Sequence, residues 1–461
     1  MNGPVNNTAD LIQKYNRSGP RYTSYPTAME LAEGTYDSDL FDAVQHSRYN
    51  ELSLYIHIPF CHQLCYYCAC NKMVTRQAQK VSRYLDYLFK EIAQRSSVFS
   101  SQKVCQIHLG GGTPNYLRPN QLNILIDTIR AHYTLKDDAE ISIELDPRLV
   151  EKGDLDALHH IGFNRISMGI QDFDNQVQTA INRVQTVEDV EQIMQDARRI
   201  GFDSVNMDLI YGLPHQSVET TEYTLDCIAT LQPDRVSLFN YAHMPDRFAA
   251  QRKIKDEWLP SANMKTAMQD AAKARLLAIG YQHIGMDHFA KANDSLSVAQ
   301  REGRLHRNFQ GYTELSDADL LGFGITSISQ VGNVITQNCK TLHDYYRELD
   351  KLDVGETASV VERGIRLSTD DLIRAAVIKQ LICHCHLDMQ SIEAEFGIHF
   401  TAYFAEELNM LEPMMQDGLL SITDNAIEVA EQGRQFSRTI CMTFDKYLPK
   451  YQRNLTFSKV I

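Results

Sequence analysis

The chain has 461 residues, of which 43% are hydrophobic and 23% charged, and its formal net charge is −14 at pH 7. Such a length accommodates about two to three domains with a large buried core, while the acidic balance disfavours nucleic-acid binding, because phosphate recruits basic surfaces. No run approaches the roughly 18 apolar residues of a membrane span, and the first residues lack the apolar core of a signal peptide, so we expect a cytoplasmic location.

Short β-rich runs alternate with stretches of helical apolar spacing between residues 51 and 290. The strand-like runs are residues 53–58, 104–109, 140–145, 164–170, 204–210 and 235–241, with 281–286 as a candidate for a seventh. The helical stretches are residues 81–99, 121–133, 187–200 and 220–231. This alternation is typical of βαβ units around a parallel sheet. We therefore predict an α/β fold with a partial or full (β/α) barrel, and an open doubly wound sheet is the alternative.

Polar and apolar residues alternate along four of these runs. Successive side chains of a strand point to opposite faces, and helices cover the apolar face. The polar faces then line the barrel interior, which in an ordinary barrel is packed with Val, Ile and Leu. A cavity that holds a polar ligand would explain these polar faces. A sheet with one solvent-exposed face is the alternative, although strands of parallel sheets are normally buried on both sides. The polar positions are Tyr55, His57, Ser142, Glu144, Asp146, Ser167, Gly169, Gln171, Asn206 and Asp208.

The two ends of the chain differ from this pattern. Two prolines and a glycine in residues 19–27 predict an extended arm, and helices followed by a hairpin around Asp424 and Asn425 are expected after residue 365. Helices with such a hairpin resemble a winged-helix domain, but the acidic helical part opposes DNA binding. The predicted organisation is an N-terminal arm at 1–50, the barrel at 51–290, a barrel extension at 291–364 and a mostly helical C-terminal domain at 365–461.

Four of the ten cysteines lie within the short segment from Cys61 to Cys70. Thiolates hold iron–sulfur clusters, and Cys61, Cys65 and Cys68 at C-x3-C-x2-C spacing can reach three corners of one [4Fe–4S] cluster. One iron then stays open, and the spacing suits S-adenosylmethionine (SAM), whose amino and carboxylate groups can chelate that iron. A structural zinc site would usually show two separated CxxC-type pairs, and chance clustering of cysteines is the remaining alternative.

A glycine run, Gly110 to Gly112, ends the second predicted strand and is followed by Thr113 and Pro114. Active sites of such barrels form at the C-terminal ends of the strands, where the cysteine segment also lies. Glycines let the backbone come close to a ligand. We therefore interpret the run as a contact for the amino group or the methionyl part of SAM; a simple turn is the alternative.

The cysteine spacing followed by a GGGTP run resembles the radical SAM superfamily. Further segments extend the likeness through nearly the whole chain, and together they resemble the oxygen-independent coproporphyrinogen III oxidases. These segments are RYTSYPT at 21–27, YIHIPFC at 55–61, SMGIQD at 167–172, DLIYGLP at 208–214, FNYAH at 239–243, GMDHF at 285–289 and HRNFQGY at 306–312. The resemblance implies an enzyme of haem synthesis that oxidatively decarboxylates two propionates of coproporphyrinogen III to vinyls, giving protoporphyrinogen IX.

The same resemblance implies the residues of the site. The implied cluster ligands are Cys61, Cys65 and Cys68, and the implied catalytic residues are Cys70, Glu144 and Arg183. Cys70 is not expected to be a cluster ligand, and a buried thiol is the alternative for it. Two SAM molecules are implied, together with the substrate. The sequence does not identify the electron donor, and a monomer is the default expectation for the oligomeric state. The implied SAM contacts are Tyr55, Tyr67, Gly111, Gly112, Thr113, Glu144, Gln171, Arg183, Asp208, Ala242 and Ile328.

Some features leave alternatives open. Propionates need cations, and Arg21 and Arg307 are candidates for this role, with surface salt bridges as the alternative. Ala69 stands where the resemblance leads us to expect glycine; if that position needs a positive φ, the placement of Cys70 shifts. The competing functions are a haem-chaperone-like radical SAM relative without oxidase activity, and a metal-binding structural or DNA-contacting protein built on the winged domain.

Overall fold

Seven parallel strands form the centre of the structure, a computed structural model that describes residues 8–315 and 317–451. In spatial order they are β14 (Ala318–Phe323), β2 (Glu51–Ile58), β5 (Lys103–Gly111), β6 (Leu135–Leu145), β7 (Arg165–Gln171), β8 (Ser204–Tyr211) and β9 (Arg235–Asn240). Antiparallel strands extend the sheet at both sides: β15 (Ile328–Val331), β16 (Val334–Asn338), β17 (Val361–Arg366) and β1 (Ala32–Glu33) beyond β14, and β11 (His288–Lys291) and β10 (Tyr281–Gly285) beyond β9. Within the described residues the edge strands β1 and β10 do not pair with each other, so the predicted barrel is confirmed in its partial form.

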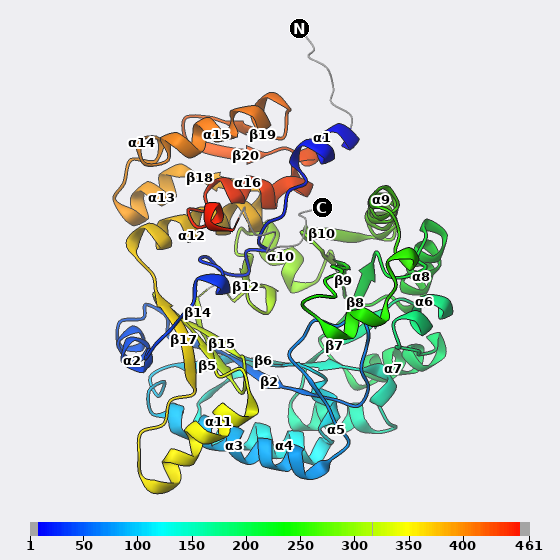
Figure 1. Ribbon diagram of the computed structural model, residues 1–461, viewed down its shortest axis with the longest axis vertical. Coiled ribbons are helices and arrows are strands. Elements are labelled where there is room, and N and C mark those ends of the chain that lie inside the picture. The colour runs from blue at the N-terminus through cyan, green and yellow to red at the C-terminus, as the bar shows by residue number, and fades with distance from the viewer. Residues whose placement is uncertain (1–7, 316, 452–461) are drawn as a thin grey trace.

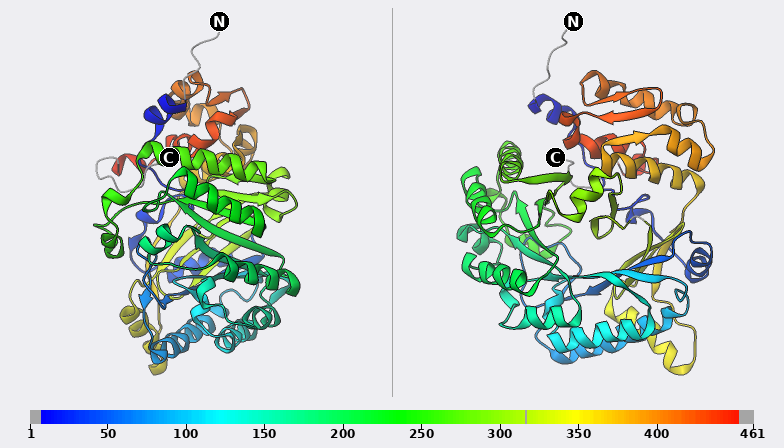
Figure 2. Two further views of the ribbon diagram at one scale, coloured as in Figure 1. Left: turned by 90° about the vertical axis from the view of Figure 1, so that its right-hand side faces the viewer. Right: turned by 180° about the vertical axis from the view of Figure 1, so that it is seen from behind.

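Helices cover the outer face of this curved sheet (Figures 1 and 2). They are α3 (Ala78–Ser96), α4 (Pro119–His132), α5 (Asp154–Ile161), α7 (Val187–Ile200), α8 (Val218–Leu231) and α9 (Ala262–Ala278). Leu54, Ile143 and Met168 belong to the apolar core between sheet and helices, and each is 0% exposed. The apolar residues of the alternating strands therefore point outward, and the polar ones point into the barrel, as the sequence predicts.

The sheet differs from the sequence prediction at two strands. Of the candidate strand at 281–286, residues 281–285 form the strand β10, but it pairs antiparallel with β11 and is not a seventh βα unit. The seventh parallel strand is β14, which pairs with β2. It was not predicted because its partner is remote in sequence and because Asp319 to Phe323 are all buried, so the strand lacks the alternation of a half-exposed one.

The C-terminal part has its own apolar core and lies above one end of the sheet (Figure 1). Its elements are α12 (Thr369–His384), α13 (Met389–Phe396), α14 (Phe400–Tyr403), α15 (Ala405–Gln416), α16 (Ser437–Thr443) and a small sheet of β18 (His386–Asp388), β20 (Ala426–Val429) and β19 (Leu420–Ile422). Helices with a hairpin agree with the predicted helical, winged-helix-like character. Among the described helices, none combines the length and the apolarity that crossing a bilayer demands.

The N-terminal arm ties this upper core to the barrel. Tyr22 and Tyr25 belong to the C-terminal core, and the Tyr22 hydroxyl donates to Asp445 at 3.0 Å. The helix α1 (Thr8–Tyr15) also packs there through Tyr15. The domain boundaries stay a prediction, and residues 1–7 and 452–461, at the two outer limits of the predicted domains, lie outside the described residues.

A buried carboxylate joins α3 to the sheet and to α11 (Leu342–Asp350). Glu91 is 0% exposed and accepts from Gly324 N at 2.8 Å, Asn338 Nδ2 at 2.8 Å and the Tyr345 hydroxyl at 2.6 Å. Its carboxylate also lies 3.5 Å from Arg95 Nη1. This carboxylate therefore holds together groups from three separate elements.

Replacing Glu91 by Gln should destabilise the protein by about 3 kcal/mol, because the buried charge of Arg95 loses its partner. Urea unfolding under anaerobic conditions measures the loss as a lower midpoint. The control is Glu151→Gln, which removes an exposed ion pair with Arg118 and should cost less than about 1 kcal/mol. Equal midpoints for Glu91→Gln and the unsubstituted protein would contradict this role.

Candidate active site

The cysteine segment leaves the C-terminal end of β2, in the middle of the parallel strands. The chain continues from β2 into β3 (Phe60–Cys61), which pairs with β4 (Met73–Val74) at the other end of the loop. Met73 N donates to Pro59 O at 2.6 Å, and Thr75 N donates to Cys61 O at 3.1 Å. These bonds close the base of the loop, so the cysteines project from a fixed platform at the strand ends, where barrel active sites form.

Neighbouring loops hold the cysteine loop on its other side. Asn182 Nδ2 donates to Leu64 O at 2.8 Å, and Tyr66 N donates to Ile181 O at 3.0 Å. A third bond runs from the buried Gln251, whose Nε2 donates to Tyr67 O at 2.9 Å and to Ala242 O at 3.2 Å. Gln251 thereby fixes two residues that the sequence predicts as SAM contacts relative to each other.

Two arginines and one aspartate lie against Cys65. Arg148 Nη2 is 3.7 Å and Arg183 Nη1 is 3.6 Å from Cys65 Sγ. Asp146 lies between the two guanidinium groups, 2.6 Å from Arg148 Nη2 and 3.2 Å from Arg183 Nη1. Burial opposes ionisation of Asp146, but the hydrogen bonds from Arg148 and the charge of Arg183 outweigh it, so the pKa of this carboxyl lies below its usual range. The site thus places net positive charge beside a thiol.

The thiols fit an iron–sulfur cluster in their chemistry. Burial raises the pKa of the Cys61 thiol to about 11, and the nearby Cys68 and Cys65 add to the rise, so the three sulfurs are close enough for their charges to interact. Iron binding replaces such protons, and the adjacent guanidinium groups offset the negative charge. Among the described residues no three His, Cys, Asp or Glu side chains converge as a single metal ion requires, so the fit rests on thiol spacing and on the neighbouring cations.

Cys70 lies beside Cys68 at the exposed end of the loop. Its backbone N donates to Cys68 Sγ at 3.4 Å, and the hydrogen bond from the Cys70 side chain lowers the pKa of Cys68 to about 6. The same bond raises the pKa of Cys70 well above its ordinary value. The pair therefore combines a thiolate at Cys68 with a neutral thiol at Cys70, which distinguishes the two sulfurs.

The glycine run passes directly over this loop. A Cβ on Gly112 would lie 2.8 Å from Phe60 O and 2.9 Å from Pro59 C, both backbone atoms, and Gly112 N donates to Ile58 O at 2.8 Å. Gly111 has a φ of +119°, in the left-handed region that favours glycine. The run therefore has a packing reason of its own, because only glycine lets β5 come so close to the cysteine loop.

A chain of polar side chains crosses the inner face of the strands. The Tyr55 hydroxyl lies 3.1 Å from His57 Nδ1, and the Tyr55 ring stacks on His108 with 6.0 Å between the ring centroids. His108 lies 3.4 Å from a Glu144 oxygen. On β8, Asp208 accepts from Asn206 Nδ2 at 2.8 Å, and burial, followed by the charge of Glu144, raises its pKa to about 6. These carboxylates line a polar interior.

The structure brings most of the predicted site residues to this one end of the barrel. Tyr55, Glu144 and Asp208 share the inner face, whereas Gln171 has a φ of +72° where β7 ends. Ile328 lies on β15, which β14 separates from β2. Sequence analysis missed the site roles of Arg148, His108 and Gln251. Two signals were available: His108 follows the same inward alternation along its strand, and Arg148 comes two residues after Asp146. No sequence signal marks Gln251.

The fold and the thiol loop define a radical SAM protein, and comparison with known families agrees. A family model for the radical SAM superfamily matches residues 55–228, and one for the HemN C-terminal domain matches residues 367–436. The chain is 51% identical over 451 residues to the oxygen-independent coproporphyrinogen III oxidase of Salmonella typhimurium, covering 98% of each chain. It is 46% identical over 458 residues to that of Pseudomonas aeruginosa, again covering 98% of each. The chain belongs to the oxygen-independent coproporphyrinogen III oxidase family.

A solved structure supports the same assignment. Coproporphyrinogen III oxidase (HemN) from Escherichia coli, described as a radical SAM enzyme, superposes with a TM-score of 0.90 at 50% sequence identity. The match covers 93% of this chain and 97% of that one. The likeness therefore extends over most of the chain and is not confined to the barrel.

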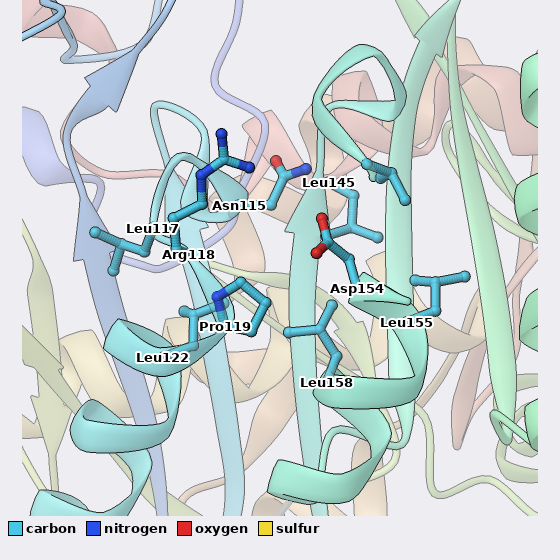
Figure 3. Close-up of a pocket in the computed structure, with 10 residues that line it drawn as sticks. Asn115, Leu117, Arg118, Pro119, Leu122, Leu145, Asp154, Leu155 and Leu158 are labelled. Carbon is cyan, nitrogen blue, oxygen red and sulfur yellow. The ribbon is translucent and has the colours of Figure 1, made fainter. Parts of the chain in front are cut away.

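A separate depression lies outside the barrel, between α4 and α5 (Figure 3). Leucines from the outward face dominate its lining, with Asn115, Arg118 and Asp154 at its polar side. It contains none of the thiols and none of the inner-face carboxylates, so it is distinct from the candidate active site.

Replacing Asp208 by Asn should stabilise the protein by about 3 kcal/mol at pH 8, because a carboxyl with a pKa near 6 must ionise there. A carboxyl whose folded pKa is raised above its unfolded value of 3.8 loses stability as the pH rises between the two values. The gain should therefore vanish below about pH 4. Urea unfolding at a series of pH values measures it, with exposed Asp138→Asn as the control. A gain that does not change with pH would contradict the argument.

Proposed function

We propose that this chain catalyses the oxidative decarboxylation of two propionates of coproporphyrinogen III to vinyls, giving protoporphyrinogen IX. The observation that carries the proposal is the three-thiol loop at the C-terminal ends of the parallel strands, facing a polar interior. It occurs in a chain that is 51% identical over its length to relatives bearing the name of this activity. The observed juxtaposition of thiols, guanidinium groups and inward carboxylates supports radical SAM chemistry at this end.

In this proposal, Cys61, Cys65 and Cys68 hold the [4Fe–4S] cluster, and two SAM molecules bind in the barrel. When bound and reduced, the cluster and SAM supply 5′-deoxyadenosyl radical chemistry that removes a hydrogen atom from the substrate. The chain's own residues hold these groups in place. Arg148 donates toward Cys65 Sγ and so offsets the charge of the cluster, while Cys70 keeps its proton and adjusts the basicity of Cys68.

Acceptors on the inner face suit the cationic and hydroxyl groups of SAM. Glu144 and Asp208 accept hydrogen bonds from amino or ribose hydroxyl groups, and Tyr55 and Gln171 add polar contacts beside them. Arg183 forms an ion pair with Asp146, donates to Gly169 O at 2.9 Å and donates to Cys65 Sγ. We therefore assign it to positioning the loop and to the carboxylate of SAM. The remaining proposed SAM contacts are Tyr67, Gly111, Gly112, Thr113, Ala242 and Ile328.

The proposal includes the partners and the location of the protein. Reductive cleavage of SAM needs an electron, so a separate electron donor must reach the exposed end of the loop near Cys70. We propose a monomer working in the cytoplasm, in haem synthesis. A haem-chaperone-like relative without oxidase activity is the second candidate, because the thiol loop alone does not select the substrate.

Anaerobic turnover with SAM, a reductant and coproporphyrinogen III tests the function. Divinyl product, with methionine and deoxyadenosine, is the expected result. Cys68→Ser should abolish vinyl formation and the change that SAM causes in the EPR spectrum of the reduced cluster. The control is Cys105→Ser, which changes a buried thiol on β5 that bonds to Leu52 O and should keep both. Methionine and deoxyadenosine without vinyl product would instead favour the haem-chaperone-like relative.

A further inference from the structure

Several cationic side chains from remote parts of the chain meet beside the end of β9. Arg21 comes from the N-terminal arm, Arg307 from β12 (His306–Asn308), and Arg438 from α16. The charges of these side chains interact. The pKa of Arg438 is lowered to about 10, mainly by burial, next by the charge of Arg21 and to a smaller extent by that of Arg307. His288, at the start of β11, lies beside them. Burial and the charges of Arg307 and Arg21 place its pKa well below the usual value.

Arg307 is the centre of this cluster and lacks a polar partner for part of its guanidinium group. The residue is 9% exposed, and its Nε and Nη1 atoms are buried without a hydrogen-bond partner. Its guanidinium carbon lies 4.7 Å from the centre of the Tyr312 ring. This cation–π contact stabilises the charge from one face of the guanidinium plane and supplies no hydrogen-bond acceptor. His288 Nδ1 is also buried without a partner. Buried donors of this kind are normally satisfied, so these atoms indicate a ligand.

The surrounding protein supplies little negative charge. Arg21 Nη1 pairs with Asp287 at 2.9 Å, and the Arg438 guanidinium group donates to the backbone oxygens of Pro20 at 3.1 Å and Gly19 at 2.5 Å. Among the described residues, Asp287 is the one carboxylate that forms an ion pair with Arg21 or Arg307. Two guanidinium groups beside one carboxylate leave a net positive site, and guanidinium groups bind carboxylates through paired N–H donors.

This group of arginines faces the same barrel interior as the polar side chains of β6 and β8. His288 lies opposite Ser237 in the pairing of β11 with β9, and Ser237 Oγ donates to Asn206 Oδ1 at 3.2 Å on the inner face. Phe239 is two residues further along β9 and therefore on the same face. The Arg21 guanidinium lies 5.7 Å from its ring centre. A ligand inside the barrel can thus reach both the cations and the carboxylates of β6 and β8.

We infer that Arg307, Arg21 and His288 bind a propionate carboxylate of the substrate; the inference rests on the proposed function, which supplies a substrate with propionates. Arg438 is a positioning residue that holds the arm backbone next to Arg21. A carboxylate could also come from SAM. A SAM molecule on the open iron would place its carboxylate at the cysteine loop beyond β2, whereas this group of arginines lies beside β9, at the other side of the parallel strands. The second SAM molecule of the proposed function is the other source, and the SAM affinity measured below distinguishes it from the substrate propionate.

Binding of coproporphyrin III, the unreactive tetracarboxylate analogue, tests the inference without turnover. Its affinity for the anaerobically reconstituted holoenzyme is measured by fluorescence quenching, alongside that of its tetramethyl ester. Arg307→Gln should weaken binding of the acid about tenfold or more and leave binding of the ester unchanged. Arg307→Lys should recover part of the lost affinity, because lysine restores the positive charge but not the paired N–H donors of a guanidinium group. The matched control is Arg304→Gln on the same segment, which pairs with exposed Glu302 and should change nothing.

The outcomes separate the possible sources of the carboxylate. The SAM-induced change in the EPR spectrum and the affinity for SAM should be the same in Arg307→Gln as in the unsubstituted protein. A weakened SAM affinity with unchanged coproporphyrin affinity would assign the cluster to SAM and overturn the inference, as would equal coproporphyrin affinity in both proteins. If Arg307→Gln does not fold, Arg21→Gln, on a side chain that is 35% exposed, decides by the same measurement. Failure of vinyl formation alone would count against the proposed function, not against this site.

Discussion

The architecture depends on one constraint: each parallel strand must cover its apolar face with helices, which leaves its other face to line the interior. Leu54, Ile143 and Met168 are 0% exposed on the outer side, while Tyr55, Glu144 and Asp208 point inward. Because the strands are parallel, all their C-terminal ends meet at one edge. A loop after β2, a glycine run at the end of β5 and Asp146 after β6 are therefore brought together by the topology of the sheet.

The cysteine loop illustrates how this edge is made rigid. Gly112 is required because backbone atoms of Phe60 and Pro59 occupy the space that a Cβ would need. Asn182, in the chain after β7, and Gln251, in the chain after β9, donate hydrogen bonds to carbonyl groups of this loop. The backbone that carries the thiols is thus held by hydrogen bonds from neighbouring loops. Such support is what a site needs when its reacting groups must be held within fractions of an ångström.

Sequence patterns predicted those helices, strands and site residues whose structure is determined by neighbouring residues in the chain. The six predicted strands and the four predicted helices, α3, α4, α7 and α8, were found because burial of one face imposes a period of two or 3.6. Glu144 and Asp208 followed from the alternation of polar and apolar residues within their strands. The strand β14 was not found, because it is buried on both faces and pairs with a strand remote in sequence. Arg148 and Gln251 acquire their roles only through tertiary contacts, so no local signal could reveal them. The domain boundaries stay predictions.

The distribution of charge inside the barrel explains how two very different ligands can be kept apart. Glu144 and Asp208 form an acidic region on β6 and β8, and the repulsion between them contributes to the raised pKa of Asp208. Arg21 and Arg307 form the opposite region near β9, where they place the pKa of His288 well below the usual value. A sulfonium cation is favoured at the first region and a carboxylate at the second. Since the whole chain carries a net charge of −14, this pair of arginines is a local exception, and the long-range field of the protein does not account for it. The interior thus orients a cationic cofactor and an anionic substrate by the same electrostatic difference.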